Sequence, residues 1–525
     1  MSEISLTDNR QIARAAGTVM FAFLLSSSVG LLRQILIANA FGTQSEMEAF
    51  NAANRVSETL FNLVAGGALS SAFIPTFAAI LTKGEKRRVW ELASAIANLI
   101  LLFLSILCIF ASFFAPEIVR YVLAPGFVGN PEKVALTIYL LRLMLPSAVI
   151  FGLSSLTMGI LNSHQIFLVP ALAPTFYQLG MIFGVLFLAP HIGVIGLGWG
   201  VVIGAGLHLL IQIPTLFRLN GKFYPTLGLK DSEVREVGRL LAPRLLGVAA
   251  VQMNFWINTR LASQFSEGSV TGVVLAFTLM LMPQAAIAQS IAIAAMPTFS
   301  VQVAQGKINE LRTSMAASLR SALLLSIPAS FGLMVLRKPL IEFLYQRGEF
   351  NQLSTELVSW ALLWYAIGLA GHAVVEILSR AFYSFHDTKT PVLVGVGAMG
   401  INTLLSYLLS SLFIKIGWMP HGGLALANST ATAIEAVLLF SIMRGRLGGL
   451  DGLAILTVVG KGFFAALLMV FTLSLWLVFS GDSPVWLVVG MGLLLGIVVY
   501  SLLLFALKVS EIRFLVTVIN KRFLR

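Results

Sequence analysis

The chain has 525 residues, of which 58% are hydrophobic and 11% are charged, and its formal net charge is +12. This composition excludes an ordinary water-soluble globular protein, and a mean hydropathy of +0.90 indicates an integral membrane protein. The positive charge does not indicate nucleic-acid binding, because the basic residues are spread over short loops rather than gathered in one patch.

Apolar stretches long enough to cross a bilayer recur along the chain. A hydrocarbon core of roughly 30 Å needs about 20 apolar residues per helix, whereas the strands of a membrane β-barrel would give shorter, alternating runs. We expect the first run to be an uncleaved span, because it is too long for a signal peptide and lacks an A-x-A cleavage site. We therefore predict an all-α integral membrane protein with about fourteen transmembrane helices at 15–41, 48–82, 89–115, 132–160, 166–189, 192–217, 238–262, 269–304, 314–336, 354–381, 390–415, 422–443, 453–480 and 484–508.

Two of these predicted helices are unusually long and contain candidate kinks. Gly66 and Gly67 lie within 48–82, and Pro283 lies within 269–304. Breaks of this kind are tolerated where a cavity can satisfy the freed backbone groups, and small residues also allow close helix packing.

Lysine and arginine alternate between the two sides of this topology. One side is rich in them and includes Lys83, Lys86, Arg87 and Arg88. The other side has only Arg120, Lys133, Arg337, Lys338, Arg347 and Lys415. The positive-inside rule makes the rich side cytoplasmic. We therefore predict that the N- and C-termini are both cytoplasmic.

An internal repeat is visible at an offset near 222 residues. The equivalent segments are "SSAFIPTF" at 70–77 with "AIAAMPTF" at 292–299, "EIVRYVLAPGF" ending at Phe127 with "LIEFLYQRGEF" ending at Phe350, His164 with His386, and Pro170 with Pro391. Six predicted helices separate the copies, so both have the same orientation and are related by an axis along the membrane normal. Parallel repeats are typical of transporters whose lobes rock around a central site, although coincidence of helix-packing patterns is an alternative. We predict a six-helix lobe at 1–221, a linker and a second six-helix lobe at 222–446, and two additional helices with a basic tail at 447–525.

Charged and amide side chains follow one face of the second predicted helix. A charged side chain at membrane depth costs about 2.5–3.5 kcal/mol on insertion scales, so it normally faces a cavity or a partner. The positions i, i+3, i+7, i+10 and i+14 are occupied by Glu48, Asn51, Arg55, Glu58 and Asn62. The first helix has a similar face with Ser26, Gly30, Arg33 and Gln34. We predict that the two faces line one water-filled groove.

An arginine in such a groove suits an anionic ligand. Its planar fork matches phosphate oxygens in a bidentate manner. The alternative is that Arg33 or Arg55 neutralises Glu48 or Glu58 in a packing role.

The C-terminal half has fewer candidate site residues. Glu376 and Glu435 fall within apolar helices, and Asn402 lies on a neighbouring helix. These groups could bind a coupling cation or carry a proton, but structural contacts between helices are an equally good interpretation. The single cysteine, Cys108, indicates packing rather than a disulfide or a metal site, so we expect no metal.

Enzyme motifs are missing from the sequence. It contains no G-x-x-x-x-G-K-[ST], no H-E-x-x-H and no G-x-S-x-G with partners. Its longest loop, about 218–238, is too short for a catalytic domain. We predict a protein that is not an enzyme and has no cofactor, and whose transport depends on gradients, membrane potential or substrate supply.

Several longer motifs resemble one known family. They are "ALSSAFIPTF" at 68–77, "VLAPGF" at 122–127, "GILNSHQIFLVPALAPT" at 159–175 and "AFYSFHDTKTPV" at 381–392. The chain resembles the MurJ/MviN family of lipid II flippases, which belong to the multidrug, oligosaccharidyl-lipid and polysaccharide exporter superfamily. The resemblance covers essentially the whole chain and implies a bacterial inner-membrane protein that moves undecaprenyl-pyrophosphate-disaccharide-pentapeptide to the outer leaflet by alternating access for peptidoglycan synthesis. It also implies a lipid-tail groove formed with the two additional helices, and partners among membrane lipids and cell-wall synthesis proteins.

The resemblance assigns cavity roles to a few positions. Arg33 matches a cavity arginine of the family, Glu48 matches an acidic position and Arg55 matches a position that is basic in a relative. The departures from the family pattern are Gln34 where an acid often occurs, and Ser27, Phe61 and Thr278 where other cavity arginines align. Because of these departures, another undecaprenyl-linked polysaccharide unit is an alternative cargo.

One further hypothesis keeps a transporter but changes its cargo, and another belongs to a different class. A small cationic drug would favour an acidic, aromatic cavity, whereas two arginines favour an anion. A non-transporting scaffold of a cell-wall complex would not need the lobe repeat with buried charges.

Overall fold

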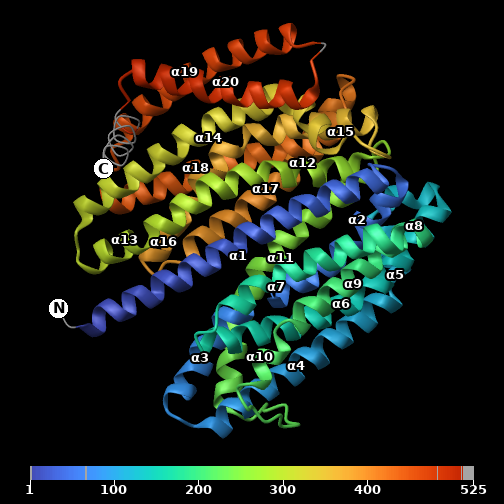
Figure 1. The fold of residues 1–525 in the computed structure, drawn as a ribbon, viewed down its shortest axis with the longest axis vertical. Helices are drawn as coiled ribbons and strands as arrows, with labels where there is room; N and C mark the ends of the chain where they lie inside the picture. Colours follow the sequence, from blue (N-terminus) through green and yellow to red (C-terminus); the bar gives the residue numbers. More distant parts are fainter. Residues whose placement is uncertain (1–2, 66–67, 482, 510, 512–525) are drawn as a thin grey trace. The chain divides into compact units, whose positions relative to one another are not determined.

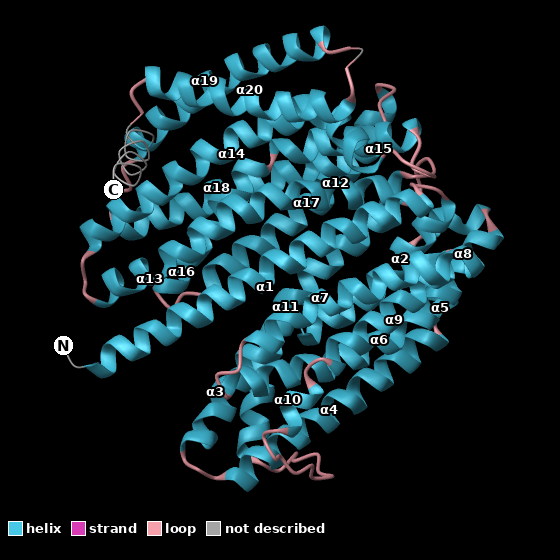
Figure 2. Ribbon diagram, viewed as in Figure 1, coloured by secondary structure: helices cyan, strands magenta, loops and turns pink. Residues whose placement is uncertain are grey.

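The structure is a computed structural model, and it describes residues 3–65, 68–481, 483–509 and 511. Every regular element among these residues is a helix, and none of them forms a strand (Figures 1 and 2). They form two compact units. The first unit comprises the residues up to Glu267 together with Arg347–Phe350, and the second comprises Gly268–Gln346 and the residues from Asn351 onward. The predicted all-α class is therefore confirmed.

The first unit contains the N-terminal helices and two short π-helical segments, η1 and η3. Its elements are α1 (Glu3–Phe41), α2 (Ser45–Ala65), α3 (Ala68–Thr82), α4 (Lys86–Phe113), α5 (Ala115–Glu117), η1 (Ile118–Leu123), η2 (Pro125–Gly129), α6 (Pro131–Ser163), α7 (Leu168–Phe183), η3 (Gly184–Leu188), α8 (Ala189–Ile192), α9 (Val194–Leu210), α10 (Ile213–Phe217) and α11 (Ser232–Ala262). Helix α2 packs along α6, and α1 packs along α7. This packing decides which side chains of α1 and α2 face protein.

The second unit contains the remaining helices. They are α12 (Ser269–Gln284), the π-helical η4 (Ala285–Gln289), α13 (Ser290–Ala304), α14 (Ile308–Tyr345), α15 (Gln352–Ile367), α16 (Leu369–Ser384), α17 (Lys389–Lys415), α18 (His421–Leu447), α19 (Gly452–Phe479) and α20 (Val485–Ala506). The two additional helices, α19 and α20, both pack on α14, where the Tyr500 hydroxyl donates to the Leu324 carbonyl over 2.8 Å.

The helices agree with the predicted spans. Within the described residues, 11 helices are long and apolar enough to cross a membrane, or up to 13 if each of two bent pairs is one span. The remaining predicted span, 48–82, corresponds to α2 and α3, and its expected kink at Gly66 and Gly67 lies outside the described residues. The other expected kink, at Pro283, is followed by the π-helical turn of η4. A proline there removes one backbone donor from the helix.

The predicted repeat appears as matching local structure inside each unit. Phe77 and Phe299 are both fully buried, and each follows a proline inside its helix. Asn130 and Asn351 both cap a helix, and their side chains accept from the backbone N–H three residues on, at α6 and at α15 respectively. Such caps satisfy an N–H that the helix leaves unpaired. The lobe boundaries at 221 and 446 stay predictions.

One turn corrects the register of the repeat. After α6, the Ile166 N–H donates to the Leu161 carbonyl, and after α16, the Asp387 N–H donates to the Phe382 carbonyl, at 3.0 and 3.1 Å. Gln165 and His386 have left-handed φ angles of 60° and 58° in these turns. Gln165 therefore stands opposite His386, one residue away from the predicted pairing of His164 with His386. The imidazole of His164 instead bonds the carbonyl of Ile160.

The first unit holds a short segment from between α14 and α15. In Arg347–Phe350, the Glu349 N–H donates to the Asn39 carbonyl over 3.0 Å, and Glu349 accepts from the Gln44 side chain over 2.8 Å. Gly348 lies so close that a Cβ atom would be 2.4 Å from the Asn39 carbonyl oxygen. Only glycine fits at this contact with the end of α1.

We expect Gly348→Ala to lower the thermal unfolding midpoint of the detergent-solubilised protein. Gly348 has a φ of +56°, so alanine costs about 1–2 kcal/mol in backbone strain, and its methyl group also clashes with Asn39. Gly84→Ala is the matched control, because Gly84 has a φ of +76° and nothing within 4 Å of its Cβ position. Equal shifts of the two midpoints would contradict the contact.

Candidate functional site

Arg33 is the charged residue of α1 within the predicted groove. Its Nη1 donates to the Met181 sulfur over 3.3 Å, and its Nη2 donates to Gln34 Oε1 over 3.1 Å. Its Nε is buried without a hydrogen-bond partner. In the part of the chain that the structure describes, Arg33 has no ion pair. A guanidinium whose charge is met only by a thioether and an amide can accept an anion without first breaking a salt bridge.

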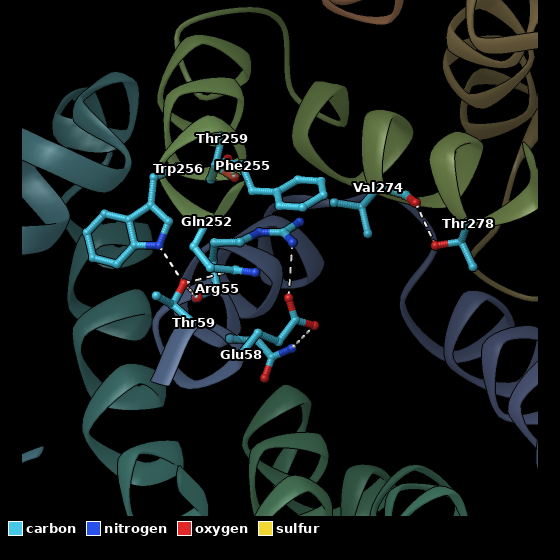
Figure 3. A network of polar contacts seen from close by, with 10 residues as sticks. Arg55, Glu58, Thr59, Gln252, Phe255, Trp256, Thr259, Val274 and Thr278 are labelled. Atoms are coloured by element: carbon cyan, nitrogen blue, oxygen red, sulfur yellow. Dashed lines mark hydrogen bonds and ion pairs between the residues drawn. The ribbon is translucent and has the colours of Figure 1, made fainter. Parts of the chain in front are cut away.

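Arg55 on α2 has an acidic neighbour on the same helix. Its Nη1 lies 3.0 Å from Glu58 Oε2, and the side chains of Arg55 and Glu58 are 15% and 45% exposed. Glu58 also accepts from Asn54 over 2.9 Å. Figure 3 shows the Arg55 guanidinium between Glu58 and the ring of Phe255. Arg55 and Glu58 thus form the ion pair that the alternative interpretation allows, with Glu58 as the more exposed partner.

Helix α7 borders the Arg33 region. It packs along α1 and supplies Met181, whose sulfur accepts from Arg33. The Gln178 amide of α7 lies 3.5 Å from the Cβ position of Gly30, one turn before Arg33. Helix α7 is therefore the neighbour that encloses Arg33 within the first unit.

Glu48 occupies a different environment from Glu58. Lys133, in the first turn of α6, donates to Glu48 Oε2 over 2.5 Å, and the two side chains are 8% and 2% exposed. The Lys133 ammonium also lies 4.1 Å from the ring centroid of Phe127. Because α2 packs along α6, this end of the predicted polar face is closed by protein. A cavity role for Glu48 stays a prediction.

The remaining predicted residues of the groove lie near these charges. Asn51 and Asn62 are half-buried on α2, one turn to either side of Arg55 and Glu58, and Gln34 accepts from Arg33. None of these contacts identifies a ligand, so their roles also stay predictions.

Residues of α11 border the site but were not among the predicted site residues. Gln252, Phe255 and Trp256 all contact α2 at Arg55 or Thr59. The signal in the sequence is the segment "QMNFWINT" at 252–259, which has four polar side chains within a predicted membrane helix. Uncharged polar residues are common in such helices, so this pattern alone does not distinguish a site from packing.

The three positions without the family arginine have other surroundings. Ser27 is exposed on α1, and the Phe61 ring packs against Phe151 with centroids 4.5 Å apart. The Thr278 hydroxyl donates to the Val274 carbonyl along its own helix.

Each candidate coupling residue of the second unit has its own neighbour within that unit. Glu376 pairs with Arg380 over 2.5 Å, and Asn402 accepts from Ser406 over 3.2 Å. Glu435 faces Gly395 of α17 and has no ion pair within the described residues. No group of three or more His, Cys, Asp or Glu side chains suited to a metal occurs within the described residues.

Sequence comparisons relate most of the chain to one family. A family model described as lipid II flippase MurJ matches residues 37–500. The "Lipid II flippase MurJ" of Burkholderia cenocepacia is 30% identical over 441 residues, which cover 82% of this chain and 84% of the relative. The "Probable lipid II flippase MurJ" of Buchnera aphidicola subsp. Acyrthosiphon pisum is 30% identical over 424 residues, which cover 80% of this chain and 82% of the relative.

Comparison with solved structures agrees with the family match. A structure titled "Lipid II flippase MurJ, inward closed conformation" superposes with a TM-score of 0.77 at 26% identity and covers 92% of this chain and 97% of its own. An inward-facing multidrug resistance MATE family transporter of the MOP superfamily gives a TM-score of 0.69 at 15% identity. The match covers 81% of this chain and 96% of the transporter. The second likeness shows a shared fold.

Proposed function

Since this chain belongs to the lipid II flippase MurJ family and acts as a lipid II flippase, we propose that Arg33 and Arg55 bind the pyrophosphate of lipid II inside the first unit. The single observation that carries the proposal is the state of Arg33, a half-buried guanidinium whose partners are the uncharged Met181 and Gln34. A pyrophosphate offers several anionic oxygens, and an arginine fork binds such groups through charge-assisted hydrogen bonds.

Arg55 and Glu58 contribute a second, competing contact. Glu58 is 45% exposed, so its carboxylate can turn toward water while Arg55 turns to a phosphate oxygen. When the lipid leaves, Arg55 forms its ion pair with Glu58 again. This exchange gives the site a way to release its anion without leaving a charge unpaired at membrane depth. In this proposal, Gln34, Asn51 and Asn62 border the same predicted groove and contact the polar head of the lipid.

The remaining features of transport follow from the family and the charge pattern. The protein is a multi-pass protein of the inner membrane, with lipid II as its substrate. The loop charges support cytoplasmic N- and C-termini, and the lack of enzyme motifs supports translocation without catalysis. Cell-wall synthesis proteins are candidate partners, because they consume the delivered lipid.

Coupling to an ion gradient would use the second unit. Glu435 is the better candidate there, because Glu376 is already paired with Arg380. Asn402 is the candidate amide ligand, although it already accepts from Ser406.

Reconstitution in vesicles tests the cargo. We expect the purified protein to exchange lipid II between leaflets faster than a polysaccharide unit on the same undecaprenyl pyrophosphate, with and without an imposed membrane potential. Equal exchange of both lipids would favour the alternative cargo, and no exchange of either would favour a scaffold. Protein-free vesicles control for spontaneous exchange.

A further inference from the structure

Helix α11 contacts α2 at the residues that surround Arg55. The Phe255 ring lies against the guanidinium, with Arg55 Cζ 5.2 Å from the ring centroid (Figure 3). Next to it, the Trp256 indole N–H donates to Thr59 Oγ1 over 2.7 Å. Two successive aromatic residues of one helix thus reach the same turn of α2.

The Phe255 contact restricts where the Arg55 guanidinium can lie. An aromatic face attracts a guanidinium through its negative quadrupole, and the attraction grows when both groups are withdrawn from water. Arg55 is only 15% exposed, and its Nε is buried without a hydrogen-bond partner. With Phe255 on one face and Glu58 at Nη1, the guanidinium plane is fixed from two directions.

The Trp256 contact reaches the backbone of Arg55. The Thr59 hydroxyl that accepts from Trp256 itself donates to the Arg55 carbonyl over 2.7 Å. Gln252, one turn before Trp256 on α11, lies 3.4 Å from the same hydroxyl. Two successive hydrogen bonds, from Trp256 to Thr59 and from Thr59 to the Arg55 carbonyl, therefore link the backbone of Arg55 to α11. Phe255 contacts the Arg55 side chain.

We propose that Phe255 and Trp256 are positioning residues that present the Arg55 guanidinium to the lipid pyrophosphate. Phe255 keeps one edge of the guanidinium directed away from α11, so that an anion displacing Glu58 meets an arginine that needs no reorientation. Preorganisation of this kind raises affinity because less side-chain freedom is lost on binding. This inference rests on the proposed function, in which Arg55 binds the pyrophosphate.

A double-mutant cycle on the full-length protein tests the inference. The probe is undecaprenyl pyrophosphate, and its dissociation constant is measured by titration calorimetry in detergent. We expect Phe255→Leu to raise this constant about three- to tenfold, as the loss of one partly desolvated cation–π contact implies. Phe255→Tyr keeps the aromatic face and should restore the affinity. In an Arg55→Ala background, Phe255→Leu should have no further effect, because there is no guanidinium left to position.

Two controls separate positioning from folding. Met253 is 64% exposed on α11, and Met253→Ala should leave the affinity unchanged. Trp256→Phe removes the indole donor but keeps an aromatic ring, and it should weaken binding less than Phe255→Leu, with both variants retaining normal thermal unfolding midpoints. If Phe255→Leu does not fold, the same cycle is measured with Trp256→Phe instead. Trp256→Phe should then weaken binding in the original protein and have no further effect in the Arg55→Ala background.

The outcomes distinguish the two proposals. If Arg55→Ala does not weaken binding, the assignment of Arg55 in the proposed function is wrong. If Arg55→Ala weakens binding but Phe255→Leu has no effect, or has the same effect in both backgrounds, the positioning role is overturned while the proposed function stands.

Discussion

Arg33→Ala is expected to abolish lipid II transport while leaving the protein folded and present in the membrane. Hydrogen bonds to charged groups contribute about 1.5–3 kcal/mol each. The loss of even one such bond to a pyrophosphate therefore lowers the affinity about tenfold to a hundredfold. The partners of Arg33 are the Met181 sulfur and the Gln34 amide, so its removal breaks no ion pair. The measurement is growth of a flippase-depleted strain that expresses the variant, together with lipid II exchange in vesicles.

Two further variants sharpen this test. Arg33→Lys keeps the charge but not the planar fork, and we expect it to retain a small part of the activity. Arg142 is an arginine of α6 that bonds the Ser112 carbonyl and lies outside the proposed groove, so Arg142→Ala should support growth. Normal growth with Arg33→Ala at normal expression would contradict the proposed role of Arg33.

The positions of the helices could be predicted because bilayer thickness sets a minimum length of apolar sequence. The same physical cost exposes Arg33 and Arg55, since a charged residue in an apolar segment needs an explanation. Phe255 and Trp256 carry no such signal, because an aromatic residue in a membrane helix is unremarkable until its neighbour is known. Their contact with Arg55 joins residues about 200 positions apart in sequence, and helical periodicity does not specify which helices become neighbours.

Lys133 shows that the sequence also does not reveal which charged residues become buried. The count of basic residues places it on the outer side, at the start of the predicted helix 132–160, where a lysine at the membrane surface needs no partner. In the structure, Lys133 is 8% exposed and pairs with Glu48, 85 positions earlier. Helical spacing places Glu48 on the same face as Arg55, but it does not show where packing against α6 closes that face. Of the two acids on the predicted polar face of α2, Glu48 is buried and Glu58 is 45% exposed.

Breaking the Glu48–Lys133 pair is expected to destabilise the first unit strongly. Removing one partner of a buried ion pair costs about 3–5 kcal/mol, because the other charge is left buried without compensation. Glu48→Met and Lys133→Met should therefore each lower the unfolding midpoint, measured by denaturant titration of the detergent-solubilised protein. The double variant Glu48→Met/Lys133→Met should recover most of that loss, since apolar replacement of a whole buried pair is often neutral.

The double variant also separates two roles of Glu48. If the carboxylate only holds α2 against α6, a stable double variant will transport lipid II, because Arg55 and Glu58 keep their places on α2. If Glu48 contacts the lipid or its coupling ion, the double variant will be stable and inactive. Independent, additive losses from the two single substitutions would contradict the buried pair itself, since residues that act through one contact cannot lose it twice.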